Sequence, residues 1–293
     1  MKIAIIGGNG YIGSSLIRRL TEETEHTVVS VSQHAENTHY DSERVSAKNA
    51  DIFDVNAMHA VLADCDVAYY LVHMMGQTKR NFVEAEADAA NSLVEAVKET
   101  SVTKIIFLGG LGNDSEHLSK HLASRHKTGE LLRKSDAQVI EFRASMVIGK
   151  GSASYDIIAN LVHKLPILFL PVWAKTLTQP IGLHDAVSYL VASLSLKDTK
   201  DHTVEIGGPE AMTYKNLMLR YARWKKTKTW SIHVPFVPVF VASWWLDSFT
   251  PGNHAKVGKV MVESLANPMI VTNQKSQKLF PQIEPHVIED CFV

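Results

Sequence analysis

Residues 2–16, KIAIIGGNGYIGSSL, decide the fold of this chain. The apolar run Lys2–Ile6 is typical of a strand that is buried on both faces of a parallel sheet. Gly7, Gly10 and Gly13 follow at once with the spacing G-x-x-G-x-x-G, and a helix-like pattern comes directly after them. A glycine loop between a strand and a helix is a much stronger signal than the glycines alone.

Each glycine of this loop has a physical role in binding an anionic dinucleotide. The first permits a tight turn, the second lets the backbone approach a pyrophosphate, and the third lets the helix pack close to the strand. The N–H groups and the dipole of the helix N-terminus then face the phosphates. We therefore predict that a dinucleotide lies with its pyrophosphate over Gly10. We expect it to contact Gly7, Asn9, Gly10, Tyr11, Ile12 and Gly13.

Strand-like and helix-like segments alternate through the first two-thirds of the chain. Further strands are expected at 26–32, 48–52, 66–72, 104–108 and 138–143, and helices at 11–21, 55–63, 81–100 and 124–135. This alternation implies βαβ units and a parallel sheet. The last third is less regular, with helices expected at 185–196 and 214–224. We predict an α/β fold, a Rossmann-type doubly wound parallel sheet with a small mixed C-terminal lobe. Residues 1–150 would form the NAD(P)-binding core, and residues 151–293 a substrate or partner lobe interleaved with it.

Composition narrows the choice of partners and compartment. The chain has 293 residues, 45% hydrophobic and 21% charged, with a formal net charge of −1. This near-neutral balance argues against a nucleic-acid partner. Cys65 and Cys291 do not make a disulfide framework, so we expect a cytoplasmic location.

Two apolar stretches bear on targeting and membranes. The run at residues 2–6 is too short for the core of a signal peptide. The run at 234–246 contains Pro235 and Pro238 and is shorter than the ~18–20 residues that span a bilayer. We expect no transmembrane segment. A buried or partner-facing role is the favoured interpretation of 234–246, and contact with a membrane surface stays open as the alternative.

The end of the second expected strand bears on the choice of cofactor. An acidic residue there favours NAD, and an arginine favours the 2′-phosphate of NADP. The sequence has Ser32, Gln33 and His34, which are neither. Ser32 and Gln33 can hydrogen-bond a ribose or a phosphate, so we expect NAD(P) with a slight preference for NADP.

The segment NADIFD, residues 49–54, offers a second contact with the adenosine. The carboxylate of Asp51 can accept a hydrogen bond from the adenine amino group, with Ile52 against the ring. Capping of the next helix by Asp51 or Asp54 is an equally good interpretation.

Several motifs together resemble a known family. They are GGNGYIG (7–13), NADIFD (49–54), DVAYYLVHMM (66–75), IIFLGGLG (105–112) and HLASRHKTGELLR (121–133). They are similar to the atypical, extended short-chain dehydrogenases/reductases. More narrowly, they resemble the NmrA-like group, which includes bacterial NAD(P)-binding proteins related to the complex I 39-kDa subunit. The resemblance continues to residue 251 and so covers most of the chain.

The resemblance implies a Rossmann fold with NAD(P) along the carboxyl ends of the strands and the small C-terminal lobe over the nicotinamide. It places Leu71, Val72 and His73 near the adenosine ribose or the nicotinamide ribose. It also places Gly109 and Gly110 near the nicotinamide.

Catalytic members of the wider superfamily carry a serine after the fifth strand and Tyr-x-x-x-Lys on the next helix, in which the tyrosine transfers a proton. Alignment on Glu130 puts Leu122 at the tyrosine position and His126 at the lysine position, and GGLG stands in place of the serine. His126 is a candidate ribose ligand and acid–base group, because an imidazole can accept or donate a proton near neutral pH. Tyr155 is a further candidate proton donor.

Arg143 and His184 are two more candidate donors, each with a structural interpretation that we favour. Arg143 would pair with a carboxylate, and Asp185, next to His184, would cap a helix. The structural interpretation of Tyr155 is that it caps the C-terminal lobe. His117 and His121 are spaced i, i+4 but have no recognisable third ligand, so we expect no metal site.

Two classes of function fit these features. The first is an NAD(P)-binding protein that acts as an oxidoreductase on an unknown small molecule without the Tyr-x-x-x-Lys pair. The second is a non-catalytic NADP(H)-binding redox sensor, regulator or assembly factor with a protein partner. A sugar-nucleotide epimerase or dehydratase is a weaker third possibility, because those reactions normally need the missing tyrosine and lysine. The sequence leaves open whether the chain is an enzyme.

Overall fold

The computed structural model describes residues 1–292 except 36–37, 75–80, 114–116, 166 and 235–262. The chain forms two compact units, each assembled from separate stretches. Unit 1 contains Met1–Gly109, Ser124–Arg143 and Val187–Val204, and unit 2 contains Gly110–Ala123, Ala144–Ala186 and Glu205–Val293.

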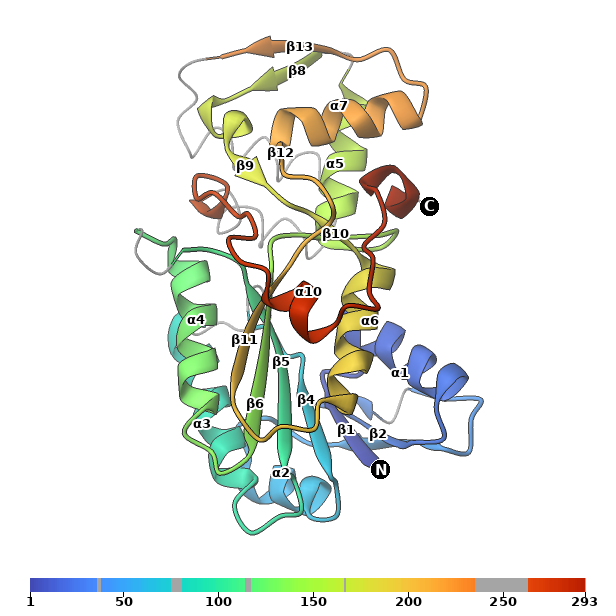
Figure 1. Ribbon diagram of the computed structural model, residues 1–293, viewed down its shortest axis with the longest axis vertical. Coiled ribbons are helices and arrows are strands. Elements are labelled where there is room, and N and C mark those ends of the chain that lie inside the picture. The colour runs from blue at the N-terminus through green and yellow to red at the C-terminus, as the bar shows by residue number, and fades with distance from the viewer. Residues whose placement is uncertain (36–37, 75–80, 114–116, 166, 235–262, 293) are drawn as a thin grey trace. The chain divides into compact units, whose positions relative to one another are not determined.

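A seven-stranded, parallel, Rossmann-like sheet organises unit 1 (Figure 1). Its strand order is β11-β6-β5-β4-β1-β2-β3. The strands are β1 (Lys2–Ile6), β2 (Thr27–Ser32), β3 (Val45–Asn49), β4 (Val67–Tyr70), β5 (Lys104–Gly110), β6 (Gln138–Ala144) and β11 (His202–Ile206). The chain reverses its direction of winding between β1 and β4, which is where an open α/β sheet binds its ligand.

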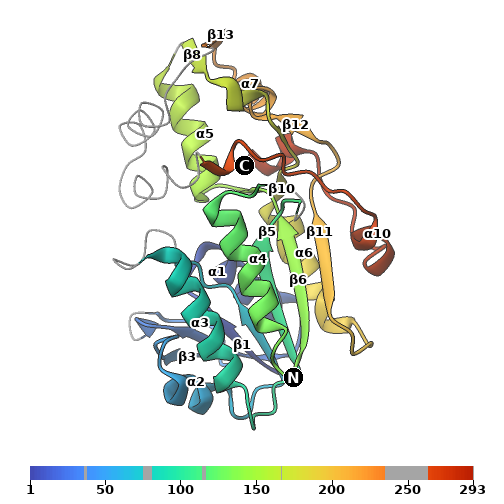
Figure 2. The same cartoon turned by 90° about the vertical axis from the view of Figure 1, so that its left-hand side faces the viewer.

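Helices cover both faces of this sheet (Figures 1 and 2). One face carries α2 (Val55–Leu62), α3 (Phe82–Ala96) and α4 (Lys120–Leu132). The other face carries α1 (Tyr11–Glu23) and α6 (Leu183–Ala192). The hydroxyl of Tyr69 on β4 donates to the carbonyl of Leu190 on α6 at 2.8 Å, which fixes α6 to this second face. The doubly wound fold predicted from the alternating pattern is thus confirmed.

The spacing of apolar residues explains how these helices pack. In α1 the buried residues are Gly13, Leu16, Ile17 and Leu20, which recur at intervals of three and four. The central strands β4 and β6 are buried throughout, as expected for strands covered on both faces. Asn81 caps α3 by accepting a hydrogen bond from the Val83 N–H at 3.1 Å.

Most element boundaries differ by a few residues from the sequence-based expectation, and three of the differences have a clear physical meaning. The third strand is Val45–Asn49 rather than 48–52, and its alternating polar residues fit a sheet edge, where one face is wet. Helix α4 begins at Lys120 rather than 124, and the Ser119 hydroxyl caps it by accepting from the Leu122 N–H at 3.2 Å. Helix α6 begins at Leu183, so Asp185 lies inside its first turn and is not its N-cap.

Unit 2 has its own apolar core around α5 (Ala153–Lys164) and α7 (Tyr214–Trp224). The aromatic rings of Tyr155, Tyr221 and Phe292 pack there, with centroids 5.2–5.6 Å apart. Short strand pairs surround these helices: β7 (Val147–Ile148) with β10 (Ile181–Gly182), β9 (Leu177–Thr178) with β12 (Met212–Thr213), and β8 (Ile167–Leu170) with β13 (Trp230–His233). The remaining elements of the described residues are η2 (Val172–Lys175), α10 (Lys275–Leu279) and η4 (Ile288–Phe292) in unit 2, and η3 (Ser193–Ser195) in unit 1.

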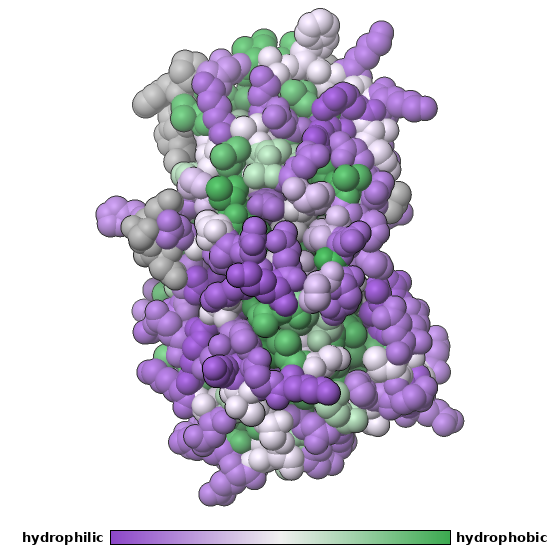
Figure 3. Space-filling model, viewed as in Figure 1, coloured by the Kyte–Doolittle hydropathy of each residue, from purple (hydrophilic) through white to green (hydrophobic). Residues whose placement is uncertain are grey.

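Polar and charged side chains cover most of the face shown in Figure 3, and apolar ones gather in a few patches among them. This agrees with helices whose apolar stripes are turned inward. Among the described residues, no helix has both the length and the apolar character needed to cross a membrane.

Candidate functional site

The glycine loop joins β1 to α1 in the conformation that the sequence predicted. Gly7 has φ +91°, a region that L side chains rarely adopt. Its N–H donates to the Val31 carbonyl at 2.9 Å, and the Gly10 N–H donates back to the Gly7 carbonyl at 3.0 Å. A Cβ on Gly13 would overlap the Gly7 carbonyl oxygen, so only glycine lets α1 start this close to the strand.

The first turn of α1 is suited to an anion. Gly10 is the N-cap and has no side chain to satisfy the helix N–H groups. A Cβ at Gly10 would meet only the Gly7 carbonyl oxygen, at 3.1 Å, so the space before the helix is otherwise open. The first turn contains no acidic residue that would oppose the helix dipole. The loop therefore fits the pyrophosphate of a dinucleotide.

A small polar cluster lies beside the loop at the end of β2. The Asn9 side-chain amide donates to the Ser32 hydroxyl at 3.0 Å. The Tyr40 hydroxyl donates to the Ser30 hydroxyl at 2.8 Å and lies 3.3 Å from the Asn9 side-chain oxygen. Gln33 follows the strand and is exposed. These hydroxyl and amide groups can hydrogen-bond a ribose hydroxyl or a 2′-phosphate, and the cluster contains no carboxylate that would repel a phosphate.

Asp51 and Ile52 lie in the turn after β3. Asp51 is exposed, and its Oδ1 accepts a hydrogen bond from the Phe53 N–H at 3.0 Å. Asp54 is the residue that caps α2, by accepting from the Ala57 N–H at 3.0 Å. Ile52 is 5% exposed and belongs to the core of unit 1. Of the two capping interpretations, Asp54 is therefore correct, and the adenine contact of Asp51 and Ile52 stays a prediction.

The segment after β4 begins next to the glycine loop. A Cβ on Gly7 would lie 3.0 Å from the carbonyl group of Leu71, and the Leu71 N–H donates to the Ile6 carbonyl at 2.9 Å. The carboxyl ends of β1, β2 and β4 thus converge at the loop. Leu71, Val72 and His73 are all partly exposed.

The buried carboxylate of Glu86, on α3, holds the segment after β4 in place through its contacts with His73 and Met74. Glu86 is 1% exposed. Its Oε1 accepts from the Met74 N–H at 2.9 Å and lies 2.9 Å from the His73 Nδ1. Its Oε2 lies 2.7 Å from an Arg125 guanidinium nitrogen and accepts from the Thr128 hydroxyl at 3.3 Å. Both carboxylate oxygens therefore have partners.

Arg125 of α4 completes the network. It is 5% exposed and donates to the Val72 carbonyl at 3.1 Å and to the Leu108 carbonyl at 2.7 Å, besides its ion pair with Glu86. Its guanidinium lies 4.6 Å from the centre of the Phe107 ring. One side chain thus holds the carboxyl ends of β4 and β5 at a fixed separation, which a rigid ligand site requires.

The electrostatics of this network favour an ionised Glu86. Burial by itself would raise the pKa of Glu86, but the Arg125 guanidinium and the hydrogen bonds of His73 and Met74 lower it well below its usual range. Burial lowers the pKa of His73, against the opposing effect of its bond with Glu86. His73 is then neutral near pH 7, and its Nδ1 can donate to the carboxylate.

Helix α4 carries the position that the alignment on Glu130 predicts for the tyrosine of the wider superfamily. Leu122 stands there, is 1% exposed, and belongs to the apolar core of unit 2. His126, one turn later, is 5% exposed. Gly129, on the same face three residues further, lies against the Glu141 carboxylate of β6, so this face of α4 packs on the sheet. The role of His126 as a ribose ligand or acid–base group stays a prediction.

The other predicted residues near the nicotinamide are divided between the two units. Gly109 at the end of β5 is in unit 1, whereas Gly110 and Tyr155 are in unit 2. The Tyr155 hydroxyl donates to the Phe292 carbonyl at 3.2 Å. Arg143 donates to the Glu141 carboxylate at 2.7 Å, as its structural interpretation proposed. The catalytic role of Tyr155 stays a prediction.

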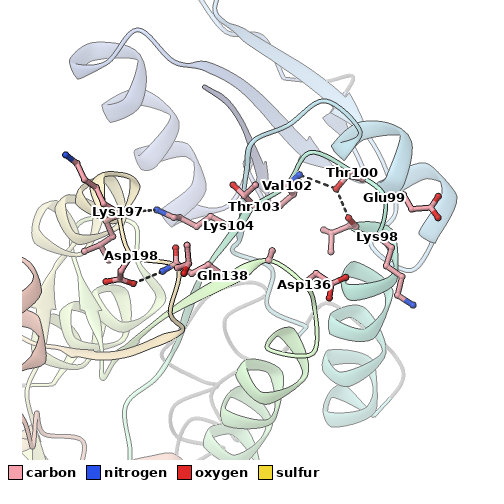
Figure 4. A pocket seen from close by; sticks show the side chains of 14 residues that line it. Lys98, Glu99, Thr100, Val102, Thr103, Lys104, Asp136, Gln138, Lys197 and Asp198 are labelled. Carbon is pink, nitrogen blue, oxygen red and sulfur yellow. Dashed lines mark hydrogen bonds between the residues drawn. The ribbon is translucent and has the colours of Figure 1, made fainter.

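A polar cavity of about 610 Å³ opens at the opposite edge of the sheet from the glycine loop (Figure 4). It lies at the amino ends of β5 and β6, away from the glycine loop. Figure 4 shows Gln138 turned toward Asp198, and the Lys104 ammonium donates to the Ser193 and Leu196 carbonyls at 3.2 and 2.9 Å. Because its polar groups serve the protein's own chain, and because ligands of parallel sheets bind at the carboxyl edge, we do not assign a dinucleotide to it.

Three residues that the structure places at or behind the candidate site were not identified from the sequence: Glu86, Arg125 and Tyr40. One signal was available for Glu86. It lies three, four and seven residues before Ala89, Ala90 and Leu93, all buried, so a carboxylate interrupts the apolar stripe of α3. No local pattern indicates Tyr40, which lies in a loop.

Comparisons with known proteins agree with this geometry. A family described as NAD(P)H-binding matches residues 7–155. A ceramide reductase of Caulobacter vibrioides is 22% identical over 192 residues, covering 65% of this chain and 60% of that protein. A mouse mitochondrial NADH dehydrogenase [ubiquinone] 1 alpha subcomplex subunit 9 is 21% identical over 196 residues, covering 66% and 51%. An uncharacterised protein of Mycobacterium tuberculosis is 22% identical over 224 residues, but the chain covers 23% of its length.

Solved structures share the fold at low identity. A triphenylmethane reductase of Citrobacter sp. complexed with NADP(H) superposes with a TM-score of 0.79 at 11% identity, covering 100% of this chain and 99% of that one. A nucleoside-diphosphate-sugar epimerase of Staphylococcus aureus gives a TM-score of 0.79 at 16% identity, with the same coverage.

The loop, the open helix N-terminus and the family match together define an NAD(P)H-binding protein with a Rossmann-like α/β fold. This chain belongs to the NAD(P)H-binding family. Dinucleotide binding, predicted from the glycine spacing, is confirmed at the level of the family.

Proposed function

We propose that this protein is an NADP(H)-dependent reductase whose acceptor does not need a proton from a tyrosine hydroxyl. The observation that carries the proposal is Leu122, which is buried in an apolar core where a catalytic tyrosine would stand. A ketone or aldehyde becomes an alkoxide when it accepts hydride, and it therefore needs a positioned acid. A quinone that accepts hydride becomes an anion whose charge is delocalised over the ring. An iminium ion that accepts hydride becomes a neutral amine. Neither acceptor therefore needs a proton at the moment of hydride transfer.

In this proposal each group of residues at the site has a separate role. A bound NADPH supplies a hydride. The glycine loop binds the pyrophosphate, and the cluster of Asn9, Ser32 and Tyr40 receives the adenosine ribose and its 2′-phosphate. Glu86 and Arg125 keep the segment after β4 in place. His126 holds the nicotinamide ribose, because it stands where related enzymes have their lysine.

Preference for NADP over NAD is part of the proposal and rests on the uncharged polar cluster at the end of β2. A carboxylate at this point would repel a 2′-phosphate. The NADP(H) complex of the similar triphenylmethane reductase supports the same choice.

The experiment measures NADPH oxidation against a panel of quinones, iminium dyes, imines, aldehydes and ketones. We expect turnover with quinones and iminium dyes and little with neutral imines, aldehydes and ketones, because those three acceptors need a proton when they accept hydride. In His126→Ala, turnover should fall by about 10²-fold or more, the scale of a positioning or acid–base group. Lys127→Ala is the matched control, because Lys127 is the next residue on α4, is exposed, and pairs with Glu130. Selective turnover of aldehydes and ketones would contradict the proposed acceptor class.

A non-catalytic NADP(H)-binding role is the second candidate. The similarity to a subunit of a mitochondrial NADH dehydrogenase supports it, as does the absence of the tyrosine at residue 122. Micromolar cofactor binding without turnover on the whole panel would favour this role. Equal or tighter binding of NADH would refute the cofactor preference in either case.

A further inference from the structure

Three side chains with metal-binding atoms converge in unit 2, outside the dinucleotide site. They are His184 and Asp185, in the first turn of α6, and His286, which precedes η4. The Nδ1 atoms of His184 and His286 lie 3.4 and 2.6 Å from the same oxygen, Oδ1 of Asp185. The two rings stand nearly perpendicular, with centroids 5.3 Å apart. Such convergence of residues about 100 positions apart is a tertiary feature.

The surroundings make Asp185 a fixed anchor and leave the histidines accessible. The Asp185 side chain is 3% exposed, and its second oxygen accepts the His286 N–H at 2.8 Å. That bond leaves Oδ1 to the two imidazoles. The His184 and His286 side chains are 62% and 51% exposed, so an ion can approach from solvent.

The distances from the two histidine Nδ1 atoms to the Asp185 Oδ1 are close to the ligand–ligand distances of a tetrahedral metal site. Tetrahedral bonds of ~2.1 Å to N and O ligands place neighbouring ligand atoms about 3.4 Å apart. The His184 Nδ1 already lies 3.4 Å from the Asp185 Oδ1. The His286 Nδ1 lies at 2.6 Å, a hydrogen-bond distance, and its half-exposed ring has to swing outward by about 0.8 Å.

We propose that His184, Asp185 and His286 form a binding site for a divalent transition-metal ion, Zn²⁺ above all, with water in the remaining position. Two imidazoles and one carboxylate suit Zn²⁺, Ni²⁺ or Co²⁺, whereas Mg²⁺ and Ca²⁺ prefer sites made of oxygen ligands. The buried carboxylate supplies the negative charge that draws a cation to this place.

The site would tie the chain around His286 to the start of α6. This segment leads into η4, whose Phe292 packs against Tyr221 in the core of unit 2. A bound ion therefore adds a cross-link between two parts of unit 2, and stability rises with metal concentration because the unfolded chain lacks the preformed site.

The test is calorimetric titration of the full chain, without a polyhistidine tag, with ZnCl₂ at pH 7.5 and with MgCl₂ in parallel. We expect one Zn²⁺ per chain and no measurable Mg²⁺ binding. His184→Ala and His286→Ala should each weaken Zn²⁺ binding more than roughly tenfold, since loss of an outer-shell partner alone costs that much. His184→Ala is the cleaner variant, because this side chain is the most exposed of the three.

The control is His202→Ala, which removes a histidine that also lies 2.8 Å from an aspartate, Asp198, but with no second histidine in that pair. Zn²⁺ affinity should be unchanged in it. As a second measurement, Zn²⁺ should raise the midpoint of thermal unfolding of the unmodified chain, but not that of His184→Ala. The proposal is overturned if the chain binds no Zn²⁺, or if both alanine variants at 184 and 286 bind it as tightly as the unmodified chain. Dinucleotide affinity should stay the same in all variants.

Discussion

Replacement of Glu86 by glutamine tests whether the buried ion pair with Arg125 supports the dinucleotide site. Glutamine has nearly the same shape and retains an oxygen that accepts the Met74 N–H, but it leaves the 5% exposed Arg125 guanidinium without its counter-charge. Breaking a buried pair on one side typically costs 3–5 kcal/mol. Because Arg125 keeps its bonds to the Val72 and Leu108 carbonyls, we expect about 3 kcal/mol.

The tryptophans that the structure describes all lie in unit 2. These residues are Trp173, Trp224 and Trp230, so their fluorescence is a poor probe for the unfolding of unit 1. Urea unfolding should instead be followed by far-UV circular dichroism, with hydrogen exchange of α3 and α4 amides to locate the loss.

A double-mutant cycle with Arg125→Met separates the ion pair from general damage. Each single variant should be destabilised, whereas the double variant should recover most of the loss, with a coupling energy of about 2–3 kcal/mol. A loss below about 1 kcal/mol in Glu86→Gln, or a coupling energy near zero, would refute the reasoning.

The same pair predicts a pH dependence with a definite sign. The pKa of Glu86 is lowered in the folded protein, so its stabilisation is complete above the ordinary carboxyl pKa of ~4.3 and is lost as pH falls below it. The slope contributed by one proton is about 1.4 kcal/mol per pH unit. Glu86→Gln should lack this contribution, and an acid limb as steep as in the unmodified chain would contradict the assignment.

Three further predictions concern the loop, the cofactor and unit 2. Gly13→Ala should reduce dinucleotide affinity at least 100-fold by calorimetry, since a Cβ there overlaps the Gly7 carbonyl; retained affinity would refute the loop assignment. Ser32→Asp should weaken NADPH binding relative to NADH binding by about tenfold, measured by cofactor fluorescence, because the new carboxylate would repel the 2′-phosphate. An unchanged ratio of the NADPH and NADH dissociation constants would show that the adenosine ribose does not bind beside Ser32. Tyr155→Phe should cost about 1 kcal/mol, seen by tryptophan fluorescence, because the bond to the Phe292 carbonyl is lost, and it should leave NADPH binding unchanged; loss of binding would indicate a direct role.

Local sequence predicted the parts of this protein that depend on local physics. The strand Lys2–Ile6 and the helix Tyr214–Trp224 have the predicted bounds, because apolar periodicity and a capping residue act within a few positions. The edge strand Val45–Asn49 was misplaced by three residues, since its alternating polar pattern is weak and its pairing with β2 is what defines it.

The candidate site divides in the same way. The glycine loop could be predicted because its spacing alone dictates a turn, a close approach and an open helix N-terminus. Glu86 and Arg125 could not be paired from sequence, because 39 positions separate them and only the packing of α3 beside α4 brings their charges to 2.7 Å. The cluster of His184, Asp185 and His286 likewise depends on the return of the chain after about 100 residues.

The sequence by itself therefore determined that this chain winds strands and helices into a parallel sheet and places a glycine loop where a pyrophosphate can bind. Tertiary structure alone decided which polar side chains support that loop. Turns and periodicity arise from neighbours along the chain, whereas the cost of burying a charge is met only by a partner that folding brings near.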